Sequence, residues 1–385
     1  MKFLHIADLH LGKRVNGFDL LADQRFVLEQ VVSLCTEKNV GAVAIAGDIY
    51  DTPVPPAEAV LLFDWFLTEL AARRIPVLAI AGNHDSAERL DYAAALLARQ
   101  GVYIAGRFTG QVPVVSLPDE HGTVDFCLLP FVRAATVRHF LPDAPITNYD
   151  TAVAAALGTL PPAAPGRRRV LLAHQMVLAG AIPPQCSGSE SVAGAAIVGA
   201  VESIDAARFS GFAYTALGHI HRAQAVGAEN IRYSGAPLCY HLDECGPQNE
   251  KSAVLVTLGP DPAAPPELAL CPLRPLHAMR HLTGPLAKLT DPATVTDAED
   301  YIWATLTDPT PLLDAMPRLR SAYPNAMKLD YAGAAANETA AAPNAVANKS
   351  FGELFDEFYE KINGAPMTGA EKEALAALQK EACIP

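Results

Sequence analysis

Residues 42–51 have the sequence AVAIAGDIYD, an apolar run that ends in a glycine and two acidic residues. Residues 76–85, PVLAIAGNHD, share this arrangement, and residues 1–10, MKFLHIADLH, also end on polar side chains. Short continuous apolar runs are typical of parallel strands that are buried on both faces. The three segments therefore predict strands over 2–7, 42–46 and 76–81, with polar residues just beyond their carboxyl ends.

The chain between these strands has the periodicity of amphipathic helices. Apolar residues recur at helical spacing over about 20–37 and about 57–73. Strands and helices that alternate in this way indicate βαβ units, with helices on the faces of the sheets. The sequence therefore predicts the α/β class. Further strands are predicted over 112–116, 124–130, 169–173, 213–217, 231–234 and 253–258.

A Pro-rich segment over 259–267 precedes a smaller unit, in which we expect strands over 301–306 and 326–331 and a helix over 312–322 that is kinked at Pro317. The Ala/Asn-rich composition of 332–348 predicts a linker. The predicted organisation is a catalytic domain over 1–275, a small α/β capping domain over 276–331, the linker over 332–348 and C-terminal helices over 349–385.

Composition excludes several classes of protein. Of the 385 residues 50% are hydrophobic and 18% are charged, which excludes wholesale disorder, and a net charge of −13 excludes a basic surface over a whole domain. No apolar run reaches the ~18 residues of a membrane span, and His5 and Asp8 interrupt the first apolar run before it could act as a signal peptide. Seven scattered cysteines without a Cys-x-x-Cys pair indicate reduced thiols, and we expect a cytoplasmic protein.

Five clusters of polar residues each follow a predicted strand. Because the carboxyl ends of parallel strands are where sites form in open α/β sheets, the clusters predict one shared site. Alternate residues in extended backbone point the same way, so each pair at i and i+2 can act together. The clusters are Asp8 and His10, Asp48 and Asp51, Asn83 with His84 and Asp85, His174, and His219 with His221.

The residue types in these clusters favour a metal centre. Carboxylate, imidazole and carboxamide groups without a thiolate argue against structural zinc and for Mn²⁺ or a similar ion. Seven ligands suit two ions if one carboxylate bridges them, and Asp48 is the candidate because it follows a central strand. Two such ions would neutralise phosphate oxygens and activate a water molecule for in-line attack. His84, next to Asn83, is then the candidate general acid or transition-state stabiliser.

Each cluster alone has a plainer interpretation. An Asp-x-His pair is more often a turn or a cap, His174 alone would more often be a structural histidine, and Asp51 could cap the following helix. Five clusters at five strand ends together favour the metal centre.

The motifs D-x-H, G-D-x-x-D, G-N-H-D, a lone histidine after a strand and G-H-x-H resemble the signature of the calcineurin-like metallophosphoesterases. This resemblance implies a two-sheet β-sandwich flanked by helices. The residues around the motifs are more particularly similar to the nuclease subunits of bacterial SbcC–SbcD complexes. They are HLGK (10–13), DIYDT (48–52), GNHDS (82–86), YSGAP (233–237) and DECG (243–246).

The resemblance also implies roles for individual residues. One Mn²⁺ would be held by Asp8, His10, Asp48 and His221, and the second by Asp48, Asn83, His174 and His219, with His84 as the catalytic histidine. The implied activity is a Mn²⁺-dependent 3′–5′ exonuclease on double-stranded DNA and an endonuclease on single strands and hairpins, in DNA repair, replication and recombination. The implied partner is an SbcC-type ATPase with a long coiled coil, in an assembly with two nuclease subunits, although the sequence shows no dimer signal. The chain has no G-x-x-x-x-G-K-[ST] motif, so ATP binding would belong to that partner.

Two further sets of residues are candidates for contacts. An apolar stripe at helical spacing near the C-terminus predicts a helix that docks on a partner groove or packs on its own domain. The basic residues Lys13, Arg14 and Arg222 could contact DNA phosphates or lie in solvent. The stripe consists of Phe351, Leu354, Phe355, Phe358 and Ile362.

Two other functions remain open. The same metal site could serve a phosphoprotein phosphatase or a cyclic-nucleotide phosphodiesterase, but Asp51 is followed by Thr52 and Pro53 where phosphoprotein phosphatases of this superfamily have a phosphate-clamping arginine. A non-catalytic scaffold for SbcC is the other alternative, and His84 argues against it because a scaffold has no need of a general acid.

Overall fold

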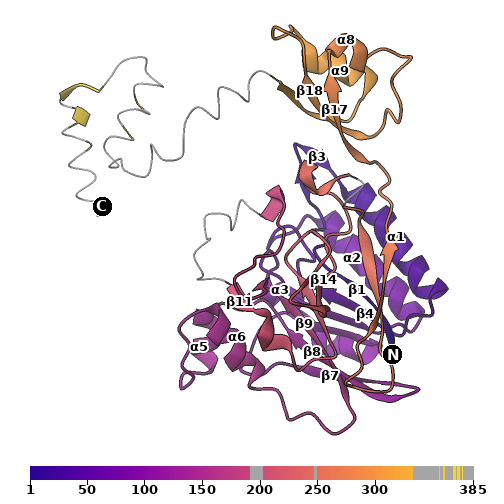
Figure 1. Cartoon of the computed structure of the whole chain (residues 1–385), viewed down its shortest axis with the longest axis vertical. Coiled ribbons are helices and arrows are strands. Elements are labelled where there is room, and N and C mark those ends of the chain that lie inside the picture. The colour runs from indigo at the N-terminus through magenta and orange to yellow at the C-terminus, as the bar shows by residue number, and fades with distance from the viewer. Residues whose placement is uncertain are drawn as a thin grey trace.

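The computed structural model describes residues 1–190, 203–246 and 249–332, and in the tail Phe355, Tyr359, 367–369, Glu371, Lys372 and Leu375. Two six-stranded sheets form its centre, with helices on their outer faces (Figure 1). In spatial order the first sheet consists of β16 (Glu267–Pro272), β15 (Ser252–Thr257), β1 (Lys2–Ile6), β4 (Val43–Ala46), β5 (Val77–Ile80) and β6 (Val102–Ala105). The second consists of β13 (Gln224–Val226), β14 (Ala228–Tyr233), β12 (Tyr214–Gly218), β9 (Arg168–His174), β8 (Gly122–Leu129) and β7 (Val114–Asp119).

The helices lie in two groups, one on each sheet. Helices α1 (Leu21–Glu37) and α2 (Ala57–Ala72) cover the first sheet, and α5 (Ala134–Phe140) and α6 (Tyr149–Leu157) cover the second (Figure 1). The shorter elements are β2 (Arg14–Val15), β3 (Phe18–Asp19), α3 (Ala87–Leu90), α4 (Ala94–Leu97), β10 (Met176–Leu178) and β11 (Ser203–Asp205).

Alternation along the strands explains the layers. In β4, Val43 and Ile45 pack under the helices of the first sheet, whereas Ala44 and Ala46 pack between the two sheets. In β9, Val170 likewise faces the other sheet. Successive side chains of a strand point to opposite faces, so a strand covered on both faces must be apolar throughout. The predicted α/β class and two-sheet sandwich are confirmed.

The direction of the strands determines where their carboxyl ends, and therefore the predicted site residues, lie. Strands β1, β4, β5 and β6 are parallel to one another, and so are β8, β9, β12 and β14.

The predicted helices over 20–37 and 57–73 are observed as α1 and α2. Among the strands of the two large sheets, β6, β13 and β16 were not predicted from the sequence. The Pro-rich segment over 259–267 proves to be largely the connection through which β16 returns along β15.

A three-stranded parallel sheet follows residue 275, the predicted end of the first domain. It consists of β17 (Met279–Gly284), β18 (Tyr301–Leu306) and β19 (Ala326–Tyr331), with α8 (Leu286–Leu289) and α9 (Ala315–Ala322) packed on it. Its own buried cluster includes Ile302, Leu306 and Leu319. We call residues 276–331 the cap. The domain boundaries themselves stay a prediction.

The predicted kink at Pro317 is wrong, because α9 begins at Ala315 instead of 312. Pro317 therefore lies in the first helical turn, where backbone N–H groups have no partner within the helix and a proline costs no hydrogen bond.

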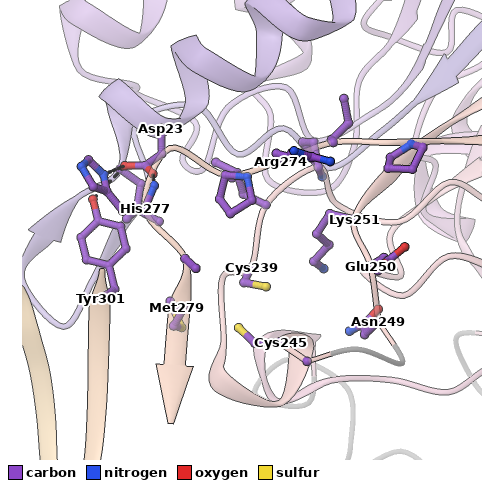
Figure 2. Close-up of a pocket in the computed structure, with 18 residues that line it drawn as sticks. Asp23, Cys239, Cys245, Asn249, Glu250, Lys251, Arg274, His277, Met279 and Tyr301 are labelled. Carbon is purple, nitrogen blue, oxygen red and sulfur yellow. Dashed lines mark hydrogen bonds and ion pairs between the residues drawn. The ribbon is translucent and has the colours of Figure 1, made fainter. Parts of the chain in front are cut away.

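Asp23 of α1 joins the cap to the rest of the molecule. Its Oδ2 accepts a hydrogen bond from Tyr301 Oη at 2.8 Å, and its Oδ1 accepts one from the backbone N–H of His277 at 2.9 Å. Figure 2 shows Asp23, His277 and Tyr301 together at one side of a cavity of about 390 Å³, with Cys239, Cys245 and Lys251 further along its wall. The cap is therefore anchored by a carboxylate that is only 2% exposed.

The predicted linker over 332–348 lies outside the described residues from 333 onward. Of the predicted docking stripe only Phe355 is described, and Phe351, Leu354, Phe358 and Ile362 lie outside the described residues. Nearby, Tyr359 Oη donates a hydrogen bond to Glu371 Oε1 at 2.7 Å. Within the described part of the chain, no helix combines the length and the apolar character that crossing a membrane requires.

Candidate metal centre

The predicted ligands follow the carboxyl ends of five parallel strands, three from one sheet and two from the other. Four of them have backbone φ angles in the left-handed region, at 55° for Asp8, 43° for His10, 50° for Asp48 and 100° for His219. Non-glycine residues in that region cost about 1–3 kcal/mol each and cluster at functional sites. The strand ends therefore turn sharply enough to bring their side chains together.

Asp48 lies at the middle of the cluster. Its Oδ2 is 3.2 Å from His174 Nε2 and 3.6 Å from His10 Nε2, and its Oδ1 accepts a hydrogen bond from the backbone N–H of His84 at 2.9 Å. Gly82 allows this approach, because a Cβ atom at that position would collide with the Asp48 carboxylate. Asp48 thus faces both halves of the cluster, as a bridging ligand would.

The first half of the cluster contains Asp8, His10 and His221. Their ligand atoms lie within 4.8 Å of one another, and the Nε2 atoms of His10 and His221 are 3.1 Å apart. Two ring nitrogens that face each other so closely are well placed to donate their lone pairs to a shared cation.

The second half contains Asn83, His174 and His219. Asn83 Oδ1 is 3.0 Å from His174 Nε2 and 3.0 Å from His219 Nδ1. His174 also reaches Asp8 of the first half, with Nδ1 3.9 Å from Asp8 Oδ1. The structure therefore brings all seven predicted ligands into one cluster.

The donor set fits a pair of divalent cations. Asp8 is fully buried, and its Oδ2 makes no hydrogen bond to any residue that the structure describes. A buried carboxylate oxygen without a partner is costly, and a cation would satisfy it. Three oxygen ligands and four imidazoles suit Mn²⁺ and similar ions better than a structural zinc site.

Burial and neighbouring charges shift the pKa values of the cluster in different directions. Burial raises the pKa of Asp8 to about 6 and lowers the pKa of His10 to about 4 and that of His219 to about 3. Burial also acts to lower the pKa of His174, but Asp48 and Asp8 outweigh it and raise that pKa to about 9. Asp48 has its pKa held well below the ordinary value, because His174 and His10 outweigh the effect of burial.

His84 is half-buried and lies beside the cluster. Its Nδ1 is 2.9 Å from the carbonyl oxygen of Asp51, and its ring centre is 4.8 Å from that of His10. A carbonyl can only accept, so Nδ1 carries the proton of this hydrogen bond and Nε2 is left for proton exchange. Asp51 does not cap α2, whose N-cap is Pro56. Its side chain lies 3.3 Å from His10 Nδ1 and 2.7 Å from Lys13 Nζ.

The three candidate DNA contacts have different surroundings. Lys13 is half-buried and paired with Asp51 at the edge of the cluster. Arg14 is exposed and donates from Nη2 to the carbonyl oxygen of Gly17 at 2.8 Å. Arg222 is half-buried and directly follows His221. Their contact with DNA stays a prediction.

Three further residues, to which the sequence assigned no role, support the cluster. Asp85, fourth in the G-N-H-D motif, accepts hydrogen bonds from the backbone N–H groups of Ile49, Tyr50 and Gly82, at 3.1, 2.9 and 2.9 Å. Gln24 holds the first loop from α1, and Glu244 is 3.0 Å from His221 Nδ1. Asp85 lies in the G-N-H-D motif and Glu244 in the DECG segment, although the sequence assigned no role to either, and no local pattern indicates Gln24.

Two family models match the chain, and the families agree with this geometry. Residues 1–223 match the family model of the calcineurin-like phosphoesterases. Residues 275–363 match the C-terminal domain of SbcD-type proteins, described as the type 5 capsule protein repressor C-terminal domain. Among solved structures, a dimetal phosphatase from Danio rerio is 12% identical with a TM-score of 0.38, over 70% of this chain and 98% of that one. The chain is a metal-dependent phosphoester hydrolase, and it belongs to the calcineurin-like phosphoesterase family as a member of the SbcD type.

Proposed function

We propose that the chain is the Mn²⁺-dependent nuclease subunit of an SbcC–SbcD-type complex. It would hydrolyse DNA phosphodiester bonds, as a 3′–5′ exonuclease on double strands and an endonuclease on single strands and hairpins, in repair, replication and recombination. The observation that carries the proposal is the convergence of seven metal-ligand side chains beside His84, in a chain with an SbcD-type C-terminal domain.

The ligands would divide into two sets that share Asp48. Asp8, His10 and His221 complete the first set, and Asn83, His174 and His219 complete the second. Two divalent ions held there would supply positive charge for the phosphate oxygens and activate a water molecule.

His84 would act as the general acid that donates a proton to the leaving group. Its Nδ1 is fixed on the Asp51 carbonyl, which orients the ring and would leave Nε2 for proton exchange with the substrate. Lys13, held by Asp51, would face the same substrate with its positive charge.

The SbcD-type C-terminal domain supports an SbcC-type partner with a coiled coil. The tail around Phe355 would dock on that partner, in an assembly that contains two copies of this chain. Substitution of Phe355 by aspartate should then abolish co-purification with an SbcC-type protein, and co-purification at the wild-type level would reject the docking role.

The central test compares substrates. The purified chain, alone and with an SbcC-type ATPase, is incubated with Mn²⁺ and linear double-stranded DNA, hairpin DNA, a cyclic nucleotide or a phosphopeptide. We expect DNA cleavage that is lost in His84→Gln and Asp48→Asn. Cleavage that survives both substitutions would contradict the proposed site. Faster turnover of the phosphopeptide or cyclic nucleotide would favour the other phosphoesterase functions, and Mn²⁺ binding without turnover of any substrate would favour a scaffold.

A further inference from the structure

Glu244 is a fully buried carboxylate outside the predicted ligand set, at the end of the short 3₁₀ helix Leu242–Glu244. Its Oε1 is 3.0 Å from His221 Nδ1. Its Oε2 accepts hydrogen bonds from Lys251 Nζ at 3.0 Å and from the backbone N–H of Tyr240 at 3.1 Å. A buried charge with this many partners is held in one orientation.

Lys251 extends the same arrangement to the backbone of the ligand. Its Nζ donates to the carbonyl oxygen of His221 at 3.1 Å, while it also pairs with Glu244. The ring of His221 is therefore fixed by Glu244, and its main chain is fixed by Lys251. The hydroxyl of Ser189 also contacts both Glu244 and His221 Nδ1.

The contact with Glu244 selects one form of the His221 ring. A carboxylate accepts, so Nδ1 carries a proton, and the opposite nitrogen Nε2 presents its lone pair to the centre, 3.1 Å from His10 Nε2. A carboxylate behind a histidine ligand also makes the imidazole a stronger donor.

We propose that Glu244 is a positioning residue that controls binding of one of the two metal ions through His221. This inference rests on the proposed dinuclear centre and adds to it a residue outside the ligand set. Since His221 would serve the ion held with Asp8 and His10, removal of Glu244 should weaken one metal site and spare the other.

The test measures Mn²⁺ binding directly. Glu244→Gln keeps the volume and an acceptor oxygen but removes the charge, and Glu244→Ala removes both. Glu250→Gln is the matched control, because Glu250 is exposed in the same loop. Calorimetric titration with Mn²⁺ gives the affinity of each site, and electron paramagnetic resonance separates a coupled Mn²⁺ pair from a single ion. Circular dichroism verifies the fold.

We expect wild type and Glu250→Gln to bind two Mn²⁺ ions. In Glu244→Ala the affinity of one site should fall about 10- to 100-fold, with a smaller loss in Glu244→Gln, and the spectrum should change from a coupled pair to an isolated ion. If Glu244→Ala does not fold, the Mn²⁺ affinities of the isosteric Glu244→Gln test the proposal.

Three results would overturn the inference. They are unchanged affinities in both variants, an equal loss at both sites, and the same loss in Glu250→Gln. Hydrolysis of bis(p-nitrophenyl) phosphate and of DNA is measured alongside. Two Mn²⁺ ions and phosphodiester turnover in wild type, without DNA cleavage, would reject the proposed nuclease function, while selective loss of one ion in the Glu244 variants would still support the positioning role.

Discussion

His84 differs in its surroundings from the seven ligands that it adjoins. Its backbone N–H is bound to Asp48 and its Nδ1 to the Asp51 carbonyl, so the ring is oriented by the protein itself. Several of the neighbouring candidate ligands also contact one another directly, as Asn83 does with His174 and His219. His84 is therefore the candidate for proton transfer and the others are the candidates for metal binding.

Substitution of His84 by glutamine should therefore slow turnover and leave metal binding intact. We expect kcat to fall by about 10²–10⁴, the usual range for loss of a general acid. The measurement is steady-state hydrolysis together with Mn²⁺ titration by calorimetry. Because His84 also lies near His10 and Asp48 at ligand distance, loss of a Mn²⁺ ion in this variant would show that His84 is itself a ligand.

Mn²⁺ affinity should rise with pH. Metal ligands bind in their deprotonated form, and burial raises the pKa of Asp8 to about 6, while Asp48 and Asp8 outweigh burial and raise that of His174 to about 9. Below about pH 6 protons compete for Asp8, and between about pH 6 and 9 Mn²⁺ displaces the proton from His174. Calorimetry in two buffers of different ionisation enthalpy should detect proton release at pH 7. Affinity independent of pH from 5 to 8 would contradict this assignment.

At the scale of elements, an ion pair joins the two strands that flank β8. Arg168, the first residue of β9, is 1% exposed and donates from Nη1 to Asp119 Oδ2, at the end of β7, over 2.8 Å. Burial acts to raise the pKa of Asp119, but the guanidinium of Arg168 and the α-amino group of Met1, which also pairs with this carboxylate, outweigh burial and hold that pKa well below its ordinary value. The ionised carboxylate is therefore the form that stabilises this edge of the second sheet.

Asp119→Asn should lower the free energy of unfolding by about 3 kcal/mol at pH 7, because it leaves the buried Arg168 without its counter-charge. Since the pKa of Asp119 is lower in the folded state, its stabilisation is present above about pH 4 and is lost as the pH falls below that value. Urea unfolding should show that the variant and wild type differ more in free energy of unfolding at pH 7 than at pH 3. An equal difference at both pH values would contradict the ion pair as its source.

At the scale of the whole molecule, the cap is a separate sheet that Asp23 anchors beside the cavity in Figure 2. His277 Nδ1 lies 3.2 Å from the same carboxylate. The metal centre does not include Asp23, so docking of the cap and assembly of the centre are separable.

Asp23→Ala should loosen the cap without emptying the metal centre. It removes the acceptor of the buried Tyr301 hydroxyl and of the part-buried backbone N–H of His277, and the unpaired buried hydroxyl costs about 1–3 kcal/mol. Hydrogen exchange should rise in the segment 273–278, while Mn²⁺ stoichiometry stays at the wild-type value. The control is Asp64→Ala, an exposed aspartate on α2. Unchanged exchange in the Asp23 variant would show that other contacts dock the cap.

The sequence by itself determined most strands of the two large sheets, the two helices that cover the first sheet and the chemistry at the strand ends. Apolar runs such as 42–46 and 76–81 indicate strands that are buried on both faces, and this information is contained in neighbouring residues. The polar residues that follow these runs are visible in the same short segments. Two of the exceptions have local causes. The apolar run 268–271 of β16 is short and lies at a sheet edge where most of the strand's residues are exposed, and α9 begins after the left-handed residue Asp314, which the periodicity does not indicate.

Only the tertiary structure decided which residues support the ligands. Gln24 on α1 and Glu244, far along the chain, reach the loops of His10 and His221 because the packing of helix, sheet and loop brings them there. Their partners lie 14 and 23 residues away, beyond the range of helical or strand periodicity. A pattern of neighbouring residues records which face of an element is buried, whereas a hydrogen bond between distant segments depends on how those elements pack.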